Sequence, residues 1–298
     1  MLFRSLMWKD SFLKYLRFER NYSEKTIVSY GIDLDKFEAY FRGVDEGLDF
    51  KSVDADVIRG WILSMMDEGY SASSVGRKLS ALRSFYHYLL KKGEIEADPV
   101  RKVMAPKKKK TIPVFVREED MNRLLDDTDF GKGFEGVRNR LILEFFYVTG
   151  VRLSELVGLK DADVDFSAKV VKVTGKRNKQ RIIPFGSELD ADLKQYLSLR
   201  NETCGMTDFF FVRSNGQKLN APAVYLLVRR SLSKVVTLKK KSPHVLRHSF
   251  ATLMLNNQAE LGAVKELLGH ESLTTTEIYT HTTFEELKKV YEQAHPRA

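Results

Sequence analysis

The sequence predicts a mainly α-helical protein of two domains, the second of which carries a small antiparallel β-sheet. Apolar residues recur at helical spacing through most of the 298 residues. A basic, proline-containing stretch interrupts the helical pattern at 97–114. Two short apolar runs surround a turn near residue 175, as in a β-hairpin. We therefore expect one domain over 1–96, a linker over 97–114 and a second domain over 115–298.

Four helices are expected in residues 1–96. The first ends before Asn21. Ser23 and Asp54 precede the second and third helices, and Ser71 or Ser73 precedes the fourth; serine and aspartate are residue types that cap helix N-termini. We interpret the apolar stripes along these helices as core packing.

The other side of the fourth helix is basic and rich in hydroxyl groups. Such a face suits contacts with phosphate groups, although a merely solvated surface has the same pattern. The side chains concerned are Arg77, Lys78 and Arg83, with Ser73, Ser74 and Ser84 among them.

The linker is punctuated by prolines and carries a run of lysines, which excludes a regular helix. One interpretation is a solvated hinge. We favour a hinge that lies along DNA, where each lysine neutralises a phosphate. The lysines of the run are Lys107, Lys108, Lys109 and Lys110.

The second domain is expected to be helical on both sides of one hairpin. The hairpin strands are placed at 170–173 and 181–184, on either side of a turn that contains Gly175 and Asn178. Helices are expected at about 117–128, 136–149, 152–160, 187–202 and 221–236, and again from His244 onward.

Composition favours a nucleic acid as the partner and a reducing compartment. Lys and Arg total 49 against 40 Asp and Glu, a formal net charge of +9. Cys204 is the single cysteine, so no internal disulfide can form. The longest apolar runs are too short to cross a bilayer, and Arg4 and Lys9 interrupt the first apolar stretch, which makes a poor signal peptide. We expect a cytoplasmic protein.

Several common chemistries lack their usual motifs. No Gly-rich phosphate loop ending in Gly-Lys-Ser/Thr is present, and no Gly-x-Ser-x-Gly. His244 and His248 have the spacing of zinc ligands, but the glutamate typical of such helices is missing and Arg247 stands between them. We interpret His248 as a packing or supporting residue. No metal and no cofactor is expected.

A set of cationic and aromatic side chains remains, each unremarkable alone. His244 and Arg247 lie three apart at the start of a helix, and Arg152 also stands at a helix start. Each of these residues alone has an ordinary structural explanation, and only their occurrence together indicates a functional site. The remaining members are Lys176 in the hairpin turn, His270 after Leu267-Leu-Gly, and Tyr279.

These residues stand in segments that resemble the motifs of the tyrosine recombinases. Length and the ending Ala294-His-Pro-Arg-Ala look most like the bacterial Xer recombinases. The similar segments are Thr149-Gly-Val-Arg-Leu-Ser-Glu-Leu, Gly175-Lys, His244-Val-Leu-Arg-His, Leu267-Leu-Gly-His and Ile278-Tyr-Thr-His.

The resemblance implies a SAM-like core-binding domain and a catalytic domain that together form a C-shaped clamp on DNA. It implies that Tyr279 is the nucleophile, which becomes joined to a DNA 3′-phosphate, and that Arg152, Lys176, His244, Arg247 and His270 complete the catalytic set. It further implies a tetramer on paired inverted half-sites, with exchange of a C-terminal segment at about 284–298. The resemblance also implies a second related recombinase and an activating DNA translocase as partners. It implies a role in resolving chromosome dimers.

The chemistry of this set agrees with that implication. Two guanidinium groups can grip the non-bridging oxygens of a phosphodiester and stay charged, as a metal ion does elsewhere. A phenol with a pKa of about 10 must lose its proton during attack, and the departing 5′-oxygen needs an acid, for which Lys176 is suited. Three alternatives stay open: an integrase or invertase of a mobile element, a DNA-binding protein that does not cut, and a type IB relaxing enzyme.

Overall fold

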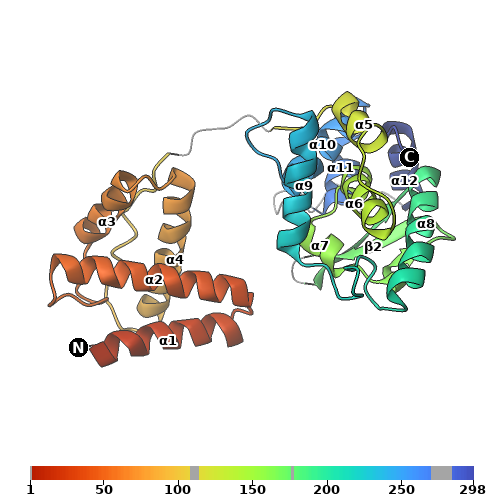
Figure 1. Ribbon diagram of the computed structural model, residues 1–298. Helices are drawn as coiled ribbons and strands as arrows, with labels where there is room; N and C mark the ends of the chain where they lie inside the picture. The colour runs from red at the N-terminus through yellow and green to blue at the C-terminus, as the bar shows by residue number, and fades with distance from the viewer. Residues whose placement is uncertain (1, 108–113, 176–177, 270–283) are drawn as a thin grey trace. The chain divides into compact units, whose positions relative to one another are not determined.

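The computed structural model describes residues 2–107, 114–175, 178–269 and 284–298 (Figure 1). Contacts divide the chain into an N-terminal unit, Met1–Thr111, and a C-terminal unit, Ile112–Ala298. The described elements are helices, apart from one sheet of three antiparallel strands in the C-terminal unit. The predicted mainly α fold with a small antiparallel sheet is confirmed.

Four helices build the N-terminal unit, and side chains cap three of them. Ser23 Oγ accepts a hydrogen bond from the Thr26 backbone N–H at 3.4 Å. Asp54 accepts from two backbone N–H groups at 2.9 Å each, and Ser71, rather than Ser73, caps the fourth helix. The predicted helix starts are therefore confirmed. The helices are α1 (Leu2–Phe18), α2 (Glu24–Val44), α3 (Ala55–Asp67) and α4 (Ala72–Lys91).

Aromatic rings fill the core between these helices. The ring centroid of Phe50, in the α2–α3 loop, lies 5.2 Å from that of Phe41 on α2 and 4.8 Å from that of Phe85 on α4. All three rings are fully buried, and both pairs are edge-to-face, the arrangement that aromatic quadrupoles favour. The interpretation of the apolar stripes as core packing is confirmed.

A buried carboxylate joins α2 to α4. Asp33 is 1% exposed, and its Oδ1 accepts hydrogen bonds from Lys78 Nζ and Arg77 Nη2 at 2.8 Å each. Lys78 is 4% exposed, so its placement on the exposed basic face of α4 was wrong. The reason is its spacing: Lys78 lies three residues after Val75 and four before Leu82, both of which are buried.

The C-terminal unit combines helices with one three-stranded antiparallel sheet. Strand order is β1-β2-β3, and Val171 pairs with Ile183, so the predicted hairpin is confirmed. The sequence pattern missed β1 because it has only two residues. The elements are α5 (Glu118–Asp126), α6 (Phe134–Thr149), α7 (Leu153–Gly158), β1 (Val164–Asp165), β2 (Val170–Thr174), β3 (Gln180–Pro184), α8 (Ser187–Cys204), α9 (Ala221–Val235), α10 (Pro243–Asn256), α11 (Leu261–Leu268) and α12 (Phe284–Ala294).

Helix α6 lies at the centre of this unit and is buried almost all round. It packs against both α8 and α10, which explains an apolar surface that is not confined to one stripe. None of the helices that the structure describes is long and apolar enough to cross a membrane.

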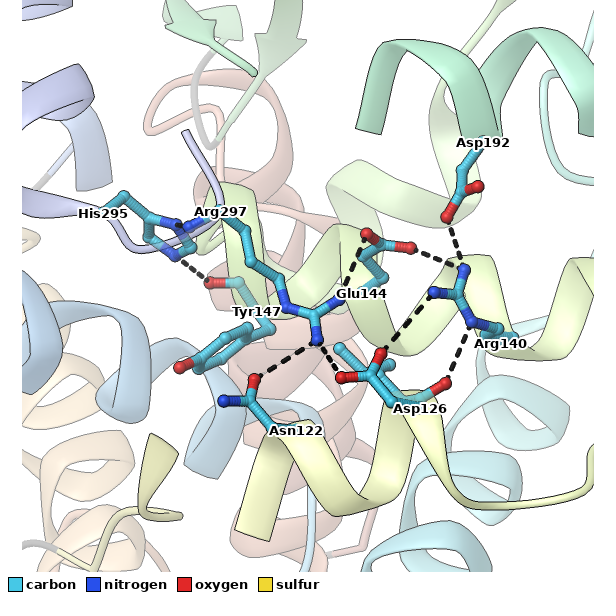
Figure 2. A network of polar contacts seen from close by, with 9 residues as sticks. Asn122, Asp126, Arg140, Glu144, Tyr147, Asp192, His295 and Arg297 are labelled. Atoms are coloured by element: carbon cyan, nitrogen blue, oxygen red, sulfur yellow. Dashed lines mark hydrogen bonds and ion pairs between the residues drawn. The ribbon is translucent and has the colours of Figure 1, made fainter. Parts of the chain in front are cut away.

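The end of the chain is bound within the C-terminal unit (Figure 2). The ring of His295 stacks on Tyr291, with centroids 5.4 Å apart, and burial lowers its pKa to about 4, so it is neutral at physiological pH. Arg297 Nη2 donates to Asp126 Oδ2 at 2.6 Å, and Arg297 Nη1 lies 3.9 Å from the buried Glu144. Burial raises the pKa of Glu144, although Arg140 and Arg297 oppose the shift. In this single chain α12 packs on its own unit, and exchange of 284–298 between protomers stays a prediction.

Removing the carboxylate of Asp33 should destabilise the N-terminal unit strongly, because Lys78 would keep a buried charge without its partner. We expect Asp33→Ala to lower the free energy of unfolding by about 3 kcal/mol. Urea unfolding followed by tryptophan fluorescence measures this, since both tryptophans, Trp8 and Trp61, belong to this unit.

Asp35→Ala is the matched control. Its side chain is 56% exposed and pairs with Lys9 at the surface of the same unit, so its loss should cost below about 1 kcal/mol. Equal losses in the two variants would contradict the importance of the buried pair.

Candidate active site

The site begins where α6 turns into α7. Gly150 ends α6 with φ of 59°, a left-handed conformation that favours glycine. A Cβ there would also lie 2.6 Å from Cδ1 of Phe250 on α10. This closely packed turn between α6 and α7 places Arg152 at the N-terminus of α7.

Two arginines from different elements bind one carboxylate, and a third, Arg247, lies close enough to interact with it electrostatically. Arg152 Nη1 and Arg181 Nη1 each donate to Glu155 Oε1 at 2.8 Å, and Arg181 Nη2 donates to Glu155 Oε2 at 2.9 Å. Glu155 Oε2 also accepts from the backbone N–H of Arg152 at 2.7 Å. The side chain of Glu155 is fully buried. Arg152, Arg181, Arg247 and Glu155 are called the arginine cluster below.

Backbone carbonyls at the end of α11 complete the cluster. Leu267 O accepts from Arg181 Nε at 2.7 Å, Leu268 O accepts from Arg247 Nη2, and Gly269 O accepts from Arg152 Nη2 at 2.9 Å. These carbonyls are at the negative end of the helix, where the backbone leaves acceptors unsatisfied. Three successive carbonyls therefore each bind a different guanidinium group.

The electrostatics of the cluster favour an anion. Burial opposes the charge on Glu155, but its hydrogen bonds to Arg181 and Arg152 outweigh this and lower its pKa to about 2. Burial lowers the pKa of Arg247 to about 9, and repulsion from Arg152 and Arg181 adds to the shift, so Arg247 is still charged at neutral pH. Three positive charges thus face a single negative one, and an added phosphate would relieve the repulsion.

The structure brings together two members of the predicted catalytic set, Arg152 and Arg247. His244 is exposed near the start of α10. His248 is exposed as well, so packing was the wrong interpretation for it, and the alternative supporting role stays a prediction. The other predicted members, Lys176, His270 and Tyr279, lie outside the described residues.

The described neighbours of two of these residues touch the cluster. A Cβ on Gly175, which precedes Lys176, would lie 3.3 Å from Glu155 Oε1. Gly269, which precedes His270, binds Arg152 through its carbonyl. The described residues that precede Lys176 and His270 therefore both lie at the arginine cluster.

Sequence reasoning missed Glu155 and Arg181. Glu155 stands three residues after Arg152, the spacing at which a glutamate reaches back to the N-terminus of its helix, so a signal was present. Arg181 offered only a weak one, a charged residue that opens the apolar run Arg181-Ile-Ile-Pro.

The predicted DNA-contact residues have different surroundings. Arg77 is exposed, but its guanidinium binds Asp33 and Ser29 Oγ. Arg83 is exposed and donates to Val103 O at 2.9 Å, and Lys107 is exposed. The others, Lys108, Lys109 and Lys110, lie outside the described residues. A shallow hollow of about 350 Å³ on α4 is lined by Ser73, Ser74, Gly76, Arg77 and Ser80.

His, Cys, Asp and Glu side chains form no group of three that could hold a metal ion among the residues that the structure describes. The cationic side chains of the arginine cluster are the features there that suit a phosphate group.

Comparisons with known proteins agree with this site. The model of the phage integrase family matches residues 114–286, and the model of the phage integrase N-terminal SAM-like domain matches 10–93. The chain is 38% identical to tyrosine recombinase XerC of Chlorobaculum tepidum, over 98% of this chain and 95% of the relative, and 41% identical to XerC of Azotobacter vinelandii, over 97% and 96%. Its fold is similar to the crystal structure of the XerH site-specific recombinase bound to difH substrate in a pre-cleavage complex, with a TM-score of 0.70 and 26% identity over 94% of this chain and 83% of that one. With both family models matched in order and relatives aligned over nearly their whole length, the chain belongs to the phage integrase family of tyrosine recombinases.

Proposed function

We propose that this chain is a Xer-type site-specific recombinase that cuts and rejoins duplex DNA through a 3′-phosphotyrosyl intermediate. The observation that carries the proposal is the arginine cluster, in which Arg152 and Arg247 are held together with an excess of positive charge. Full-length similarity to proteins named tyrosine recombinase XerC supports the Xer type.

In the proposed reaction, the two guanidinium groups bind the non-bridging oxygens of the scissile phosphate. The Tyr279 oxygen attacks phosphorus and loses its proton, and the bond from phosphorus to the 5′-oxygen breaks. Negative charge grows on the non-bridging oxygens in the transition state, where fixed cations stabilise it most. A cluster that is already held in place by backbone carbonyls does not have to reorganise as that charge develops.

Lys176 is the proposed acid that gives a proton to the departing 5′-oxygen. His244 and His270 are proposed to orient the phosphate or to move protons, and both roles stay open for each. Rejoining reverses the step: a 5′-hydroxyl attacks the phosphotyrosine and Tyr279 leaves. The tyrosyl ester keeps the energy of the broken bond, so ATP is not needed. The guanidinium groups supply the positive charge that a metal ion supplies elsewhere.

The partner is double-stranded DNA. We propose that two chains bind paired inverted half-sites and that four assemble on two duplexes, with exchange of the segment at 284–298. A second related recombinase and a DNA translocase are further proposed partners, at the nucleoid in the cytoplasm. Resolution of chromosome or plasmid dimers is the proposed role, in preference to integration or inversion of a mobile element.

Covalent trapping tests the chemistry. Wild-type protein and Tyr279→Phe are incubated with nicked duplex fragments of the source genome and a chelator, and then denatured in SDS. We expect a protein–DNA adduct with the wild type alone, because the phenylalanine has no oxygen to attack phosphorus. Sequencing the trapped DNA identifies the site, called the trapped duplex below.

Tyr225→Phe is the control for loss of a tyrosine hydroxyl, since Tyr225 is an exposed tyrosine on α9 of the same unit. It should form adduct as the wild type does. Salt-sensitive DNA binding by a wild-type chain that forms no adduct, even when host extract supplies partner proteins, would contradict the proposal and favour a DNA-binding protein that does not cut. Adducts on DNA of any sequence, with relaxation of supercoils, would indicate a type IB relaxing enzyme.

Phosphate contacts from α4 are tested through salt dependence. Arg83→Gln should reduce the slope of log Kd against log salt concentration by about 1, because one fewer counterion is released on binding. Kd is measured by fluorescence anisotropy on the trapped duplex. Arg59→Gln, an exposed arginine on α3, is the control and should leave the slope unchanged. Equal slopes for Arg83→Gln and wild type would remove Arg83 from the proposed DNA surface.

A further inference from the structure

We propose that Arg181 is a positioning residue for strand cleavage, which sets Arg152 in place by fixing both Glu155 and the end of α11. This inference rests on the proposed function. Arg181 is the arginine of the cluster that the catalytic motifs do not contain, and it lies on β3, outside the helices that carry Arg152 and Arg247.

Arg181 is placed to hold protein groups and not DNA. All three of its guanidinium nitrogens donate hydrogen bonds within the protein, two to Glu155 and one to Leu267 O. Its side chain is 11% exposed, against 34% for Arg152. Arg152 is therefore the better placed of the two to bind a phosphate, while each guanidinium nitrogen of Arg181 already binds a protein group.

The first connection runs through Glu155. The planar guanidinium of Arg181 binds both carboxylate oxygens, so the carboxylate plane is fixed. The oxygen that Arg181 Nη1 binds, Oε1, also binds Arg152 Nη1. Without Arg181, the plane of the Glu155 carboxylate would no longer be fixed, and Arg152 would lose the oriented acceptor that sets its position for a phosphate.

The second connection runs through α11. Arg181 Nε binds Leu267 O, and two residues further along Gly269 O binds Arg152 Nη2. A Cβ on Gly269 would lie 3.0 Å from Arg181 Cδ, so the side chain packs directly against this turn. On β3, Arg181 also pairs with Val173 in the hairpin. Arg181 thus joins the hairpin to the carbonyls that orient Arg152.

The charge of Arg181 gives the proposal a pH signature. The charged groups that face Glu155 in the described structure are Arg152 from α7, Arg181 from β3 and Arg247 from α10. With all three present the pKa of Glu155 is about 2, so the carboxylate is ionised throughout the working range. Loss of Arg181 removes a stabilising cation and leaves burial, which raises the pKa of Glu155. Cleavage that needs the carboxylate is then lost at a higher pH than in the wild type.

The experiment measures the rate of adduct formation on the trapped duplex with full-length Arg181→Gln and Arg181→Lys between about pH 5 and 8, where the free side chain of Glu would titrate at the lower end. We expect Arg181→Gln to be about 10- to 100-fold slower, the cost of a misplaced reacting group, with Kd for DNA near that of the wild type. Its rate relative to the wild type should fall further as pH decreases.

Arg181→Lys separates charge from geometry. A lysine keeps a cation beside Glu155 but cannot bind both carboxylate oxygens and Leu267 O at once. The variant should therefore cleave slowly, but its rate should decline on the acidic side at the same pH as that of the wild type. A wild-type rate in Arg181→Lys would overturn the positioning role and leave a purely electrostatic one.

A double-mutant cycle tests whether Arg181 acts through Glu155. Glu155→Gln should also form adduct slowly, and its rate should not show the decline at low pH that comes from protonating Glu155. Adding Arg181→Gln to Glu155→Gln should reduce the rate much less than adding it to the wild type. Fully additive effects would overturn the proposal. So would an Arg181→Gln variant with the wild-type rate and pH profile.

Arg200→Gln controls for loss of a buried arginine in the same unit. Arg200 is 2% exposed, binds both oxygens of Asp161 at 2.7 Å and donates to the carbonyls of Phe209 and Phe210. The thermal unfolding temperature should fall in both variants. Only Arg181→Gln should slow cleavage and move the pH at which the rate declines on the acidic side. Equal slowing in both would mean that lost stability explains the effect. No adduct from the wild type would contradict the proposed function itself, a result distinct from all of these.

Discussion

The carboxylate of Glu155 is the interaction on which the centre of the C-terminal unit depends. Three guanidinium groups at close quarters repel one another, and a single buried negative charge among them offsets part of that repulsion. It also supplies direction, because its two oxygens bind Arg152 and Arg181 in a defined plane. Helix α11 contributes three carbonyls on the other side, so charge and geometry are specified together.

The same arrangement occurs in the N-terminal unit with a different result. Asp33 is a buried carboxylate between Arg77 and Lys78, much as Glu155 lies between Arg152 and Arg181. There both cations bind the carboxylate directly and help to hold α2 against α4. In the arginine cluster the cations exceed it, and the excess is available to a ligand. Buried ion pairs are weak sources of net stability, so their value in both units lies in specifying which groups meet.

Features that are local in sequence were predictable, and features that join distant segments were not. Ser23, Asp54 and Ser71 predicted helix starts because a cap acts within three residues of its own position. The burial of Lys78 could have been read from its spacing with Val75 and Leu82, but its charge suggested a surface residue. Arg181 binds partners 26 and 86 residues away, and no local pattern contains them. Motif resemblance supplied Arg152 and Arg247, but it gave no role to Glu155 or to the backbone carbonyls at the end of α11, although the similar segments contain them.

The hydrogen bonds between α11 and the arginine cluster also determine when, during synthesis of the chain, the cluster can form. Arg152 and its acceptor Gly269 are separated by 117 residues, which takes about 6 to 23 s to synthesise at ordinary rates of translation. The N-terminal unit can fold during that interval, since all its helices precede residue 92. The helices of the N-terminal unit are therefore complete well before Gly269 is available to bind Arg152.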